Sequence, residues 1–173
     1  LDGLRLENFR TQGADVPTLI STVIGEPKTF NYLLSQESSS SDVLALMYEG
    51  LITIDQTTSE IVPGLAESWD ISEDGQTIVF TLRKNLKWSD GEPLTVDDVL
   101  FTYNDLILNE EIPTDTRDIL RIGAEGKLPT VSKLDADRVE FKIPEPFAPF
   151  LRVTGIGILP KHILEETVTT KDG

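Results

Sequence analysis

Most of the structural information in this chain lies in Tyr48–Asp55 (YEGLITID) and Ile61–Ile107 (IVPGLAESWDISEDGQTIVFTLRKNLKWSDGEPLTVDDVLFTYNDLI). Within the second segment, Thr77–Arg83 alternates between apolar and polar residues, which is typical of a strand with one buried face. Asp74-Gly75 before this strand and Asp90-Gly91 after it predict tight turns, because glycine accepts the positive φ that such turns need. The segment therefore predicts short antiparallel strands joined by hairpins.

A helix is predicted directly after these turns. Thr95 is a good N-cap, and carboxylates at Asp97 and Asp98 favour the positive end of a helix. Neighbouring carboxylates can also serve in acid–base chemistry, but successive residues on a helix do not face each other, so a helix start is favoured. Apolar residues follow at helical spacing: Val99, Leu100, Tyr103, Leu106 and Ile107. The pattern predicts one strong helix between Thr95 and Leu108.

The rest of the chain adds weaker signals of the same kind. Further strands are predicted at Thr18–Ile24, Leu51–Asp55, Glu60–Val62, Ser68–Ser72, Arg138–Ile143 and Gly155–Leu159. Short helices are predicted at Arg117–Ile122, at Lys161–Glu166 and after the serine run, with Ser40 or Ser41 as N-cap and Gly50 as C-cap. Together these elements predict an α+β fold, a mostly antiparallel mixed sheet with flanking helices.

The composition excludes several classes of partner. The chain has 173 residues, enough for one domain or one domain and part of another. Its net charge of −15 argues against nucleic acid and anionic lipid, which select for clustered Lys and Arg. Solubility explains this acidity, and an attraction for cationic ligands is the alternative. No apolar run is long enough to span a bilayer.

The sequence shows no catalytic apparatus. It has no cysteine, which excludes thiolate catalysis and Cys-based zinc sites. Its single histidine, His162, cannot supply a zinc site alone, and a nucleophilic triad would need it beside a serine and a carboxylate. We therefore predict no catalytic residue, no metal and no cofactor, and a helix-end or surface role for His162.

Several motifs together resemble the peptide-type (family 5) solute-binding proteins of bacterial ABC importers, the oligopeptide- and dipeptide-binding proteins. The motifs, in the expected order, are Tyr48–Leu51, Ile61–Trp69, Asp74-Gly75, Phe80–Lys84, Trp88–Thr95, Asp97–Val99, Val139–Phe141, Pro144–Pro149 and Leu159–His162. The likeness covers about Thr18 to Glu166. These residues also have simple structural roles as core and turns, so they identify the scaffold and do not form a ligand site.

The resemblance implies part of a two-lobed, periplasmic-binding-protein-like fold. Residues 1–16 are expected to be a flexible leader, 17–45 the N-terminal segment of the main first lobe, and 46–160 an accessory subdomain of that lobe. Residues 161–173 would begin the return into the main lobe. The second lobe would lie beyond Gly173, so the chain is expected to be an N-terminal fragment.

The resemblance also implies where a ligand would bind. The loop after the first strand borders the cleft in this family, which implies ligand contacts from Glu26, Pro27, Thr29, Phe30 and Asn31. A purely structural loop is the alternative for each residue. The family usually has Leu-Asn-Pro or Leu-Asp-Pro here, whereas this chain has Phe30-Asn31-Tyr32, so the ligand preference does not carry over.

The function implied is that of an extracytoplasmic receptor, periplasmic or at the cell surface, that is exported with a leader since removed. It would capture a peptide or similar small solute and deliver it to the membrane subunits of an ABC permease. The fragment is expected to be monomeric and to bind no nucleic acid. The alternatives are a ligand-presenting sensor or an assembly scaffold without transport, and, less favoured, a hydrolase.

Overall fold

The computed structural model describes residues 25–169, so the predicted leader 1–16 and strand Thr18–Ile24 lie outside the described residues. The elements, in chain order, are α1 (Ser38–Leu44), β1 (Ile52–Ile54), β2 (Ile61–Pro63), β3 (Ala66–Ile71), β4 (Thr77–Leu82), α2 (Val96–Leu100), a π-helix (Phe101–Ile107), a 3₁₀-helix (Asp115–Leu120), β5 (Thr130–Lys133), β6 (Arg138–Lys142), α3 (Phe150–Val153) and α4 (Lys161–Thr169). The predicted α+β class and its mostly antiparallel pairing are confirmed.

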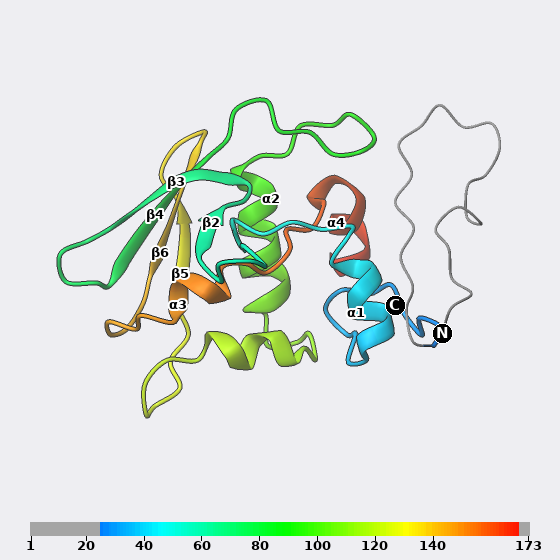
Figure 1. Cartoon of the computed structure of the whole chain (residues 1–173), viewed down its shortest axis with the longest axis horizontal. Helices are drawn as coiled ribbons and strands as arrows, with labels where there is room; N and C mark the ends of the chain where they lie inside the picture. The colour runs from blue at the N-terminus through cyan, green and yellow to red at the C-terminus, as the bar shows by residue number, and fades with distance from the viewer. Residues whose placement is uncertain (1–24, 170–173) are drawn as a thin grey trace.

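A four-stranded antiparallel sheet of order β3-β4-β6-β5 forms the larger part of the molecule. In register, Phe80 of β4 lies opposite Trp69 of β3 and Val139 of β6. The alternation predicted for β4 is confirmed, because Ile78, Phe80 and Leu82 are buried while the residues between them are partly exposed. In Figure 1 this sheet lies on one side of α2, and α1 and α4 lie on the other.

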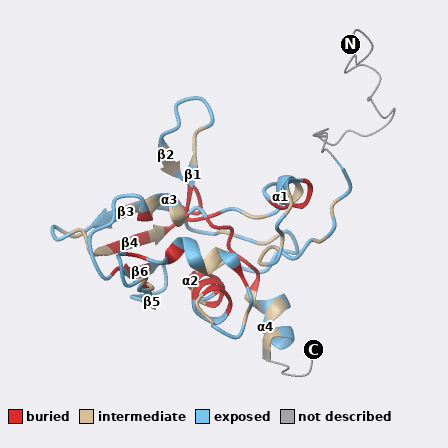
Figure 2. Cartoon of the chain, turned by 90° about the horizontal axis from the view of Figure 1, so that it is seen from below, coloured by how far each residue is buried: buried red, intermediate tan, exposed pale blue. Residues whose placement is uncertain are grey.

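Aromatic rings fill the core between the sheet and the continuous helix formed by α2 and the π-helix, which we call the central helix. Phe141 packs edge-to-face on Phe80 and on Tyr103, with ring centroids 5.5 Å and 4.8 Å apart. Phe150 of α3 reaches the same ring at 6.1 Å. Such pairs add to the gain from burial alone. Full burial raises the pKa of Tyr103 well above its usual range. Figure 2 shows buried residues concentrated in these strands and in the helix facing them.

The predicted helix from Thr95 to Leu108 begins as expected but is not α-helical throughout. Thr95 is the N-cap of α2 and forms a capping box with Asp98. From Phe101 the turns widen into a π-helix, with the amide of Leu108 donating to the carbonyl of Tyr103. This wider spacing sends Tyr103 and Ile107 into the main core, while Phe101 and Leu106 join a second small core with Leu159.

A two-stranded hairpin, β1–β2, lies beside the main sheet. Its two strands were predicted, at Leu51–Asp55 and Glu60–Val62. Gly50, predicted as a helix C-cap, has another role, because α1 ends at Leu44 with Ala45 as C-cap. A Cβ on Gly50 would lie 2.5 Å from the backbone of Gly155, so Gly50 permits a close approach of two segments.

Two further expectations were wrong, and one strand was missed. The predicted strand Gly155–Leu159 is irregular, because its amides donate to scattered partners: Gly157 to the hydroxyl of Tyr32, Ile158 to the carbonyl of Glu49, and Leu159 to the hydroxyl of Thr102. Strand β5 was not predicted. The serine N-cap was also misplaced, since the N-cap of α1 is Glu37.

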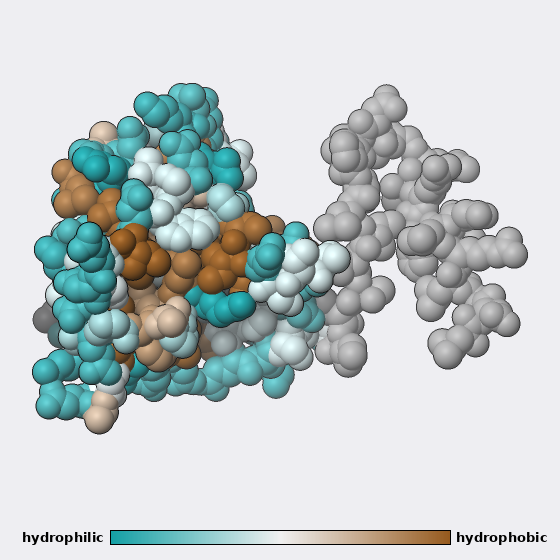
Figure 3. All heavy atoms as spheres, turned by 60° about the vertical axis from the view of Figure 1, so that its left-hand side comes forward, coloured by the Kyte–Doolittle hydropathy of each residue, from teal (hydrophilic) through white to brown (hydrophobic). Residues whose placement is uncertain are grey.

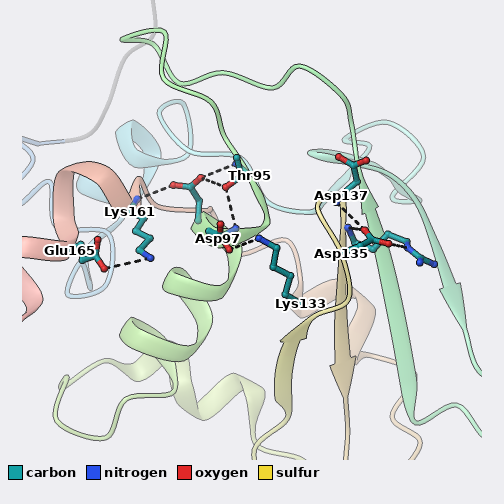
Figure 4. Close-up of polar contacts among 9 residues, drawn as sticks. Thr95, Asp97, Lys133, Asp135, Asp137, Lys161 and Glu165 are labelled. Atoms are coloured by element: carbon teal, nitrogen blue, oxygen red, sulfur yellow. Dashed lines mark hydrogen bonds and ion pairs between the residues drawn. The ribbon is translucent and has the colours of Figure 1, made fainter.

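Two helix starts meet at the buried carboxylate of Asp98. One of its oxygens accepts from the backbone amide of Thr95 at 2.8 Å, and the other accepts from the backbone amide of Lys161 at 3.0 Å. Asp98 is therefore stabilised by the positive ends of both α2 and α4. Figure 4 shows Lys161 and Glu165 of α4 beside Thr95 and Asp97 at the start of α2. The predicted helix at Lys161–Glu166 is confirmed as α4.

Candidate functional site

A hollow of about 830 Å³ opens where the N-terminal segment, the central helix and α4 meet. We call this the first hollow. Its lining comes from three places: Phe30–Leu34 with Tyr48, the end of the π-helix and the loop after it (Leu106, Asn109 and Glu111–Pro113), and Leu159 with Leu164, Thr167 and Val168. Its size is within the range of small-molecule sites, about 300–1,000 Å³.

A second hollow of about 900 Å³ shares Tyr32 and Tyr48 with the first. It is bounded by the end of α1 and the segment after it, by β1, and by the 3₁₀-helix and the turn after α3, with lining residues that include Met47, Ile54, Thr116, Ile119, Arg152 and Ile156. Leu46, Met47 and Ile119 are more than half exposed here. Figure 3 shows hydrophobic residues gathered in a band on one face of the molecule, bordered by hydrophilic ones.

The loop that carries the predicted ligand residues is held by the serine run. The hydroxyl of Ser40 accepts from the amides of Lys28 and Thr29 at 3.1 and 3.2 Å, and the hydroxyl of Ser39 donates to the carbonyl of Glu26. Ser40 in turn donates to the carboxylate of Glu37, and this bond, with the amide of Lys28, holds the pKa of Glu37 below its usual value. Both serines are buried, so the run positions this loop and does not cap the helix.

Tyr32 fixes the next part of the same segment. Its hydroxyl accepts from the amide of Gly157 at 2.7 Å, and its ring packs edge-to-face on Tyr48 at 5.5 Å. Leu33 is held as well, because its carbonyl accepts from the hydroxyl of Thr114 at 2.7 Å. Asn31 closes a local turn by accepting from the amide of Leu33.

The opposite wall of the first hollow is organised by Arg117. Its guanidinium donates to the carbonyls of Ile107, Asn109 and Ile112, the first at 2.8 Å and the last at 2.6 Å. Carbonyls at a helix end lack partners within the helix, and a cation there is favourable. Arg117 therefore shapes the loop that presents Asn109 and Ile112 to the hollow.

His162 lies on α4, outside both of these hollows but in the lining of a smaller one of about 220 Å³. Its Nε2 is 2.8 Å from the carboxylate of Asp90, and its ring is 6.3 Å from that of Trp88. The bond from His162 is the main cause that holds the pKa of Asp90 below its usual value, followed by the amide of Glu92. The described partners of the imidazole are thus a carboxylate and an indole ring.

The predicted ligand residues divide into two groups. Phe30 and Asn31 line the first hollow, and Phe30 is 58% exposed. Glu26, Pro27 and Thr29 come earlier in the chain than these two residues and do not line the first hollow. No pattern in the sequence indicated Tyr32, Ser40 or Arg117 as organisers of this site, because each acts through backbone groups that only the folded chain brings to it. Leu164 and Val168, on α4, could have been found from their spacing on one helix face.

Two features are absent from residues 25–169. Among them, no helix has the length and apolarity needed to cross a membrane. Within the same range, no cluster of three or more His, Cys, Asp or Glu side chains could hold a metal ion.

Comparison with known proteins adds three relatives. The chain is 33% identical over 147 residues to the dipeptide-binding protein of Escherichia coli, covering 78% of this chain and 27% of that protein. It is 32% identical over 129 residues to a periplasmic alpha-galactoside-binding protein of Rhizobium meliloti, covering 71% and 18%. In structure it is similar to the oligopeptide-binding protein AppA of Bacillus subtilis in complex with a nonapeptide, with TM-score 0.70 and 31% identity over 83% of this chain and 27% of that one.

The chain therefore spans about a quarter or less of the length of these relatives. The family model for bacterial extracellular solute-binding proteins, family 5, matches residues 60–171. That range contains the whole four-stranded sheet, α2, the π-helix and α4. Sequence and fold agree, and the chain belongs to the family 5 bacterial extracellular solute-binding proteins.

Proposed function

We propose that this chain is the N-terminal part of an extracytoplasmic receptor, at the cell surface or in the periplasm, that captures peptides for an ABC importer. The observation that carries the proposal is the family match across the sheet and α4, together with the structural likeness to a protein in complex with a nonapeptide. A ligand would shift an equilibrium between open and closed forms of the whole receptor, and the closed form would dock on the permease.

In this proposal the described residues play two parts. Residues 46–160, which hold the sheet, act as an accessory subdomain that stabilises the first lobe. Residues 17–45 and 161–173 belong to the main lobe, and their described parts meet at the first hollow. An extended peptide could be held there largely through its backbone, which would tolerate varied side chains.

The candidate ligand residues are Glu26, Pro27, Thr29, Phe30 and Asn31. Support comes from the exposure of Phe30 beside the first hollow and from the rigid support that Ser39 and Ser40 give to the loop. Glu26 is exposed and would contribute a carboxylate for a cationic group on the ligand.

Other solutes are the second candidate. One relative is named for an alpha-galactoside, so the same scaffold serves more than one chemical class of ligand. A sensor or an assembly scaffold would use the same fold without transport. Hydrolysis is least supported, because the relatives are named for binding and His162 lies outside the two larger hollows.

The test is calorimetric titration of the full-length protein with peptides of two to nine residues and with alpha-galactosides. Micromolar or tighter binding of peptides supports the proposal, and binding of galactosides alone overturns it in favour of the second candidate. Glu26→Gln should weaken peptide binding about tenfold, the value of one charge-assisted hydrogen bond. Glu73→Gln, in the exposed turn between β3 and β4, is the matched control.

The 173-residue chain alone should bind peptides very weakly, because one wall of a cleft cannot remove a ligand from water. Micromolar affinity of the isolated chain would show that the hollow is a complete site without a second lobe.

A further inference from the structure

Two hollows of similar size share Tyr32 and Tyr48 in their linings. The two aromatic rings meet edge-to-face at 5.5 Å, so together they form part of the boundary of each hollow. We therefore expect that truncating either ring would open one hollow toward the other.

Tyr32 and Tyr48 pack tightly against the segment that leads to α4. The amide of Gly157 donates to the hydroxyl of Tyr32 at 2.7 Å. A Cβ added to Gly157 would lie 2.7 Å from the Cβ of Tyr48 and 3.2 Å from the hydroxyl of Tyr32. The ring of Tyr32 and the Cβ of Tyr48 thus pack directly on the backbone of a buried glycine, which leaves no space for either side chain to move toward it.

The surroundings of Tyr32 are equally fixed. Asn31 accepts from the amide of Leu33, and the hydroxyl of Thr114 donates to the carbonyl of Leu33. A side chain whose neighbours are restrained on both sides keeps its position when a ligand arrives, which is the condition for a rigid boundary.

The two hollows differ in what a ligand would meet. The first hollow opens beside Phe30 and Asn31, two of the candidate ligand residues. The second presents the exposed apolar side chains of Met47 and Ile119, with the guanidinium of Arg152 at its edge. A bound peptide that extended from the first hollow into the second would bury apolar surface there.

We propose that Tyr32, packed on Tyr48, is a specificity-determining residue: the two rings are a partition that ends the first hollow and limits the length of solute it accepts. This inference rests on the proposed function. The hydroxyl bond to Gly157 positions the ring, and the ring itself sets the limit.

The experiment compares full-length wild type with Tyr32→Ala, Tyr48→Ala and Tyr32→Phe by calorimetry, using peptides graded from two to nine residues with leucine at the far end. Tyr32→Ala and Tyr48→Ala should each bind the longer peptides about tenfold more tightly relative to the shorter ones, the gain expected from burying one further apolar side chain. Tyr32→Phe keeps the ring and should keep the wild-type length preference. Its Gly157 amide should exchange hydrogen faster, because the amide has lost its acceptor.

Phe147→Ala is the control, since Phe147 is an exposed aromatic residue that lines neither hollow. It should change neither length preference nor exchange at Gly157. Circular dichroism identifies any variant that fails to fold. If one of the two alanine variants fails to fold, the length preference of the other alanine variant tests the proposal.

The outcomes separate the two proposals. If wild type binds peptides and both alanine variants keep its length preference, the partition is overturned and the proposed function stands. If wild type binds no peptide, the proposed function fails and the partition fails with it. A length preference that changes as much in Tyr32→Phe as in Tyr32→Ala also overturns the assignment, because the hydroxyl and not the ring would then set the limit.

Discussion

The sheet and the hollow-forming region of this molecule are built in different ways. In the sheet, one contiguous core takes in Ile78, Phe80 and Phe141, and all three are buried. Around the hollows, Phe30, Leu46 and Met47 are large apolar side chains that stay more than half exposed. Exposed apolar surface of this kind marks places where proteins contact ligands or other protein surface.

The two regions are stabilised by different kinds of interaction. The sheet is stabilised by side-chain burial and by hairpins between neighbours in sequence, as in β3 and β4. The hollow region depends on single hydrogen bonds between distant residues, such as Tyr32 with Gly157 and Thr114 with Leu33. Stability should therefore reside mainly in the sheet, and changes near the hollows should alter binding more than folding.

The largest expected effect breaks the core of the sheet. Phe141→Ala removes a ring that contacts Phe80, Tyr103 and Phe150 and should lower the free energy of unfolding by about 3–5 kcal/mol. Phe30→Ala, at a ring that is 58% exposed, should cost about 0.5 kcal/mol or less. Urea unfolding followed by tryptophan fluorescence measures both. Equal losses would contradict the division between the two regions.

The next effect lies at the border between the regions. Gly50→Ala should destabilise by about 3 kcal/mol, because its Cβ would meet backbone atoms of Gly155 that cannot rotate away. Gly91→Ala is the matched control. It has open space around it but a φ of +95°, and should cost about 1–2 kcal/mol. Thermal unfolding of the two variants checks the order, and the reverse order would show that the close approach relaxes readily.

Asp98→Ala tests the link between α2 and α4. It leaves two backbone amides, of Thr95 and Lys161, without their acceptor and should cost about 2 kcal/mol. Asp97→Ala, which removes an exposed ion pair with Lys133, should cost about 0.5 kcal/mol or less. Hydrogen exchange should accelerate at Lys161 only in the Asp98 variant. Unchanged protection there would mean that α4 is held by other contacts.

The smallest expected effect is the pH dependence of the pair formed by Asp90 and His162. The pKa of Asp90 is lowered in the folded state, so its contribution to stability is present above the ordinary value of 3.8 and is lost as pH falls through the folded-state value. In His162→Ala the carboxyl of Asp90 should titrate at higher pH than in wild type. Carbon-detected NMR titration measures this, and identical curves would show that the amide of Glu92 alone causes the shift.

The sheet was largely predictable because its signals are local. Alternation in Thr77–Arg83 and the Asp-Gly turns predicted β4 and its hairpin with β3, and the structure confirms both. Strand β5 was missed because only Val131 among its four residues is buried, so the sequence lacks alternation. Gly155–Leu159 has the composition of a strand, but its backbone amides donate to side-chain hydroxyls and to single carbonyls instead of to a neighbouring strand. No sequence pattern indicates such partners.

The hollow region was less predictable for the same reason. The interpretation of the serine run as a helix start was correct, but Ser39 and Ser40 face a loop about twelve residues earlier. Tyr32 was noted only as a departure from the family pattern, whereas the structure gives it a partner 125 residues away. Its importance follows from tertiary placement, which a single sequence does not specify.

The wide turn between Phe101 and Ile107 has a consequence for engineering this scaffold. A regular α-helix turns by about 100° per residue, whereas the wider π-turns advance less, so these seven residues sweep a smaller angle than seven residues of an α-helix. Rewound as an α-helix with no residue removed, this stretch would turn Leu106 away from the small core and Asn109 away from the first hollow. The wide turns thus set the angular position of every residue after them, and they let one helix contribute to two cores.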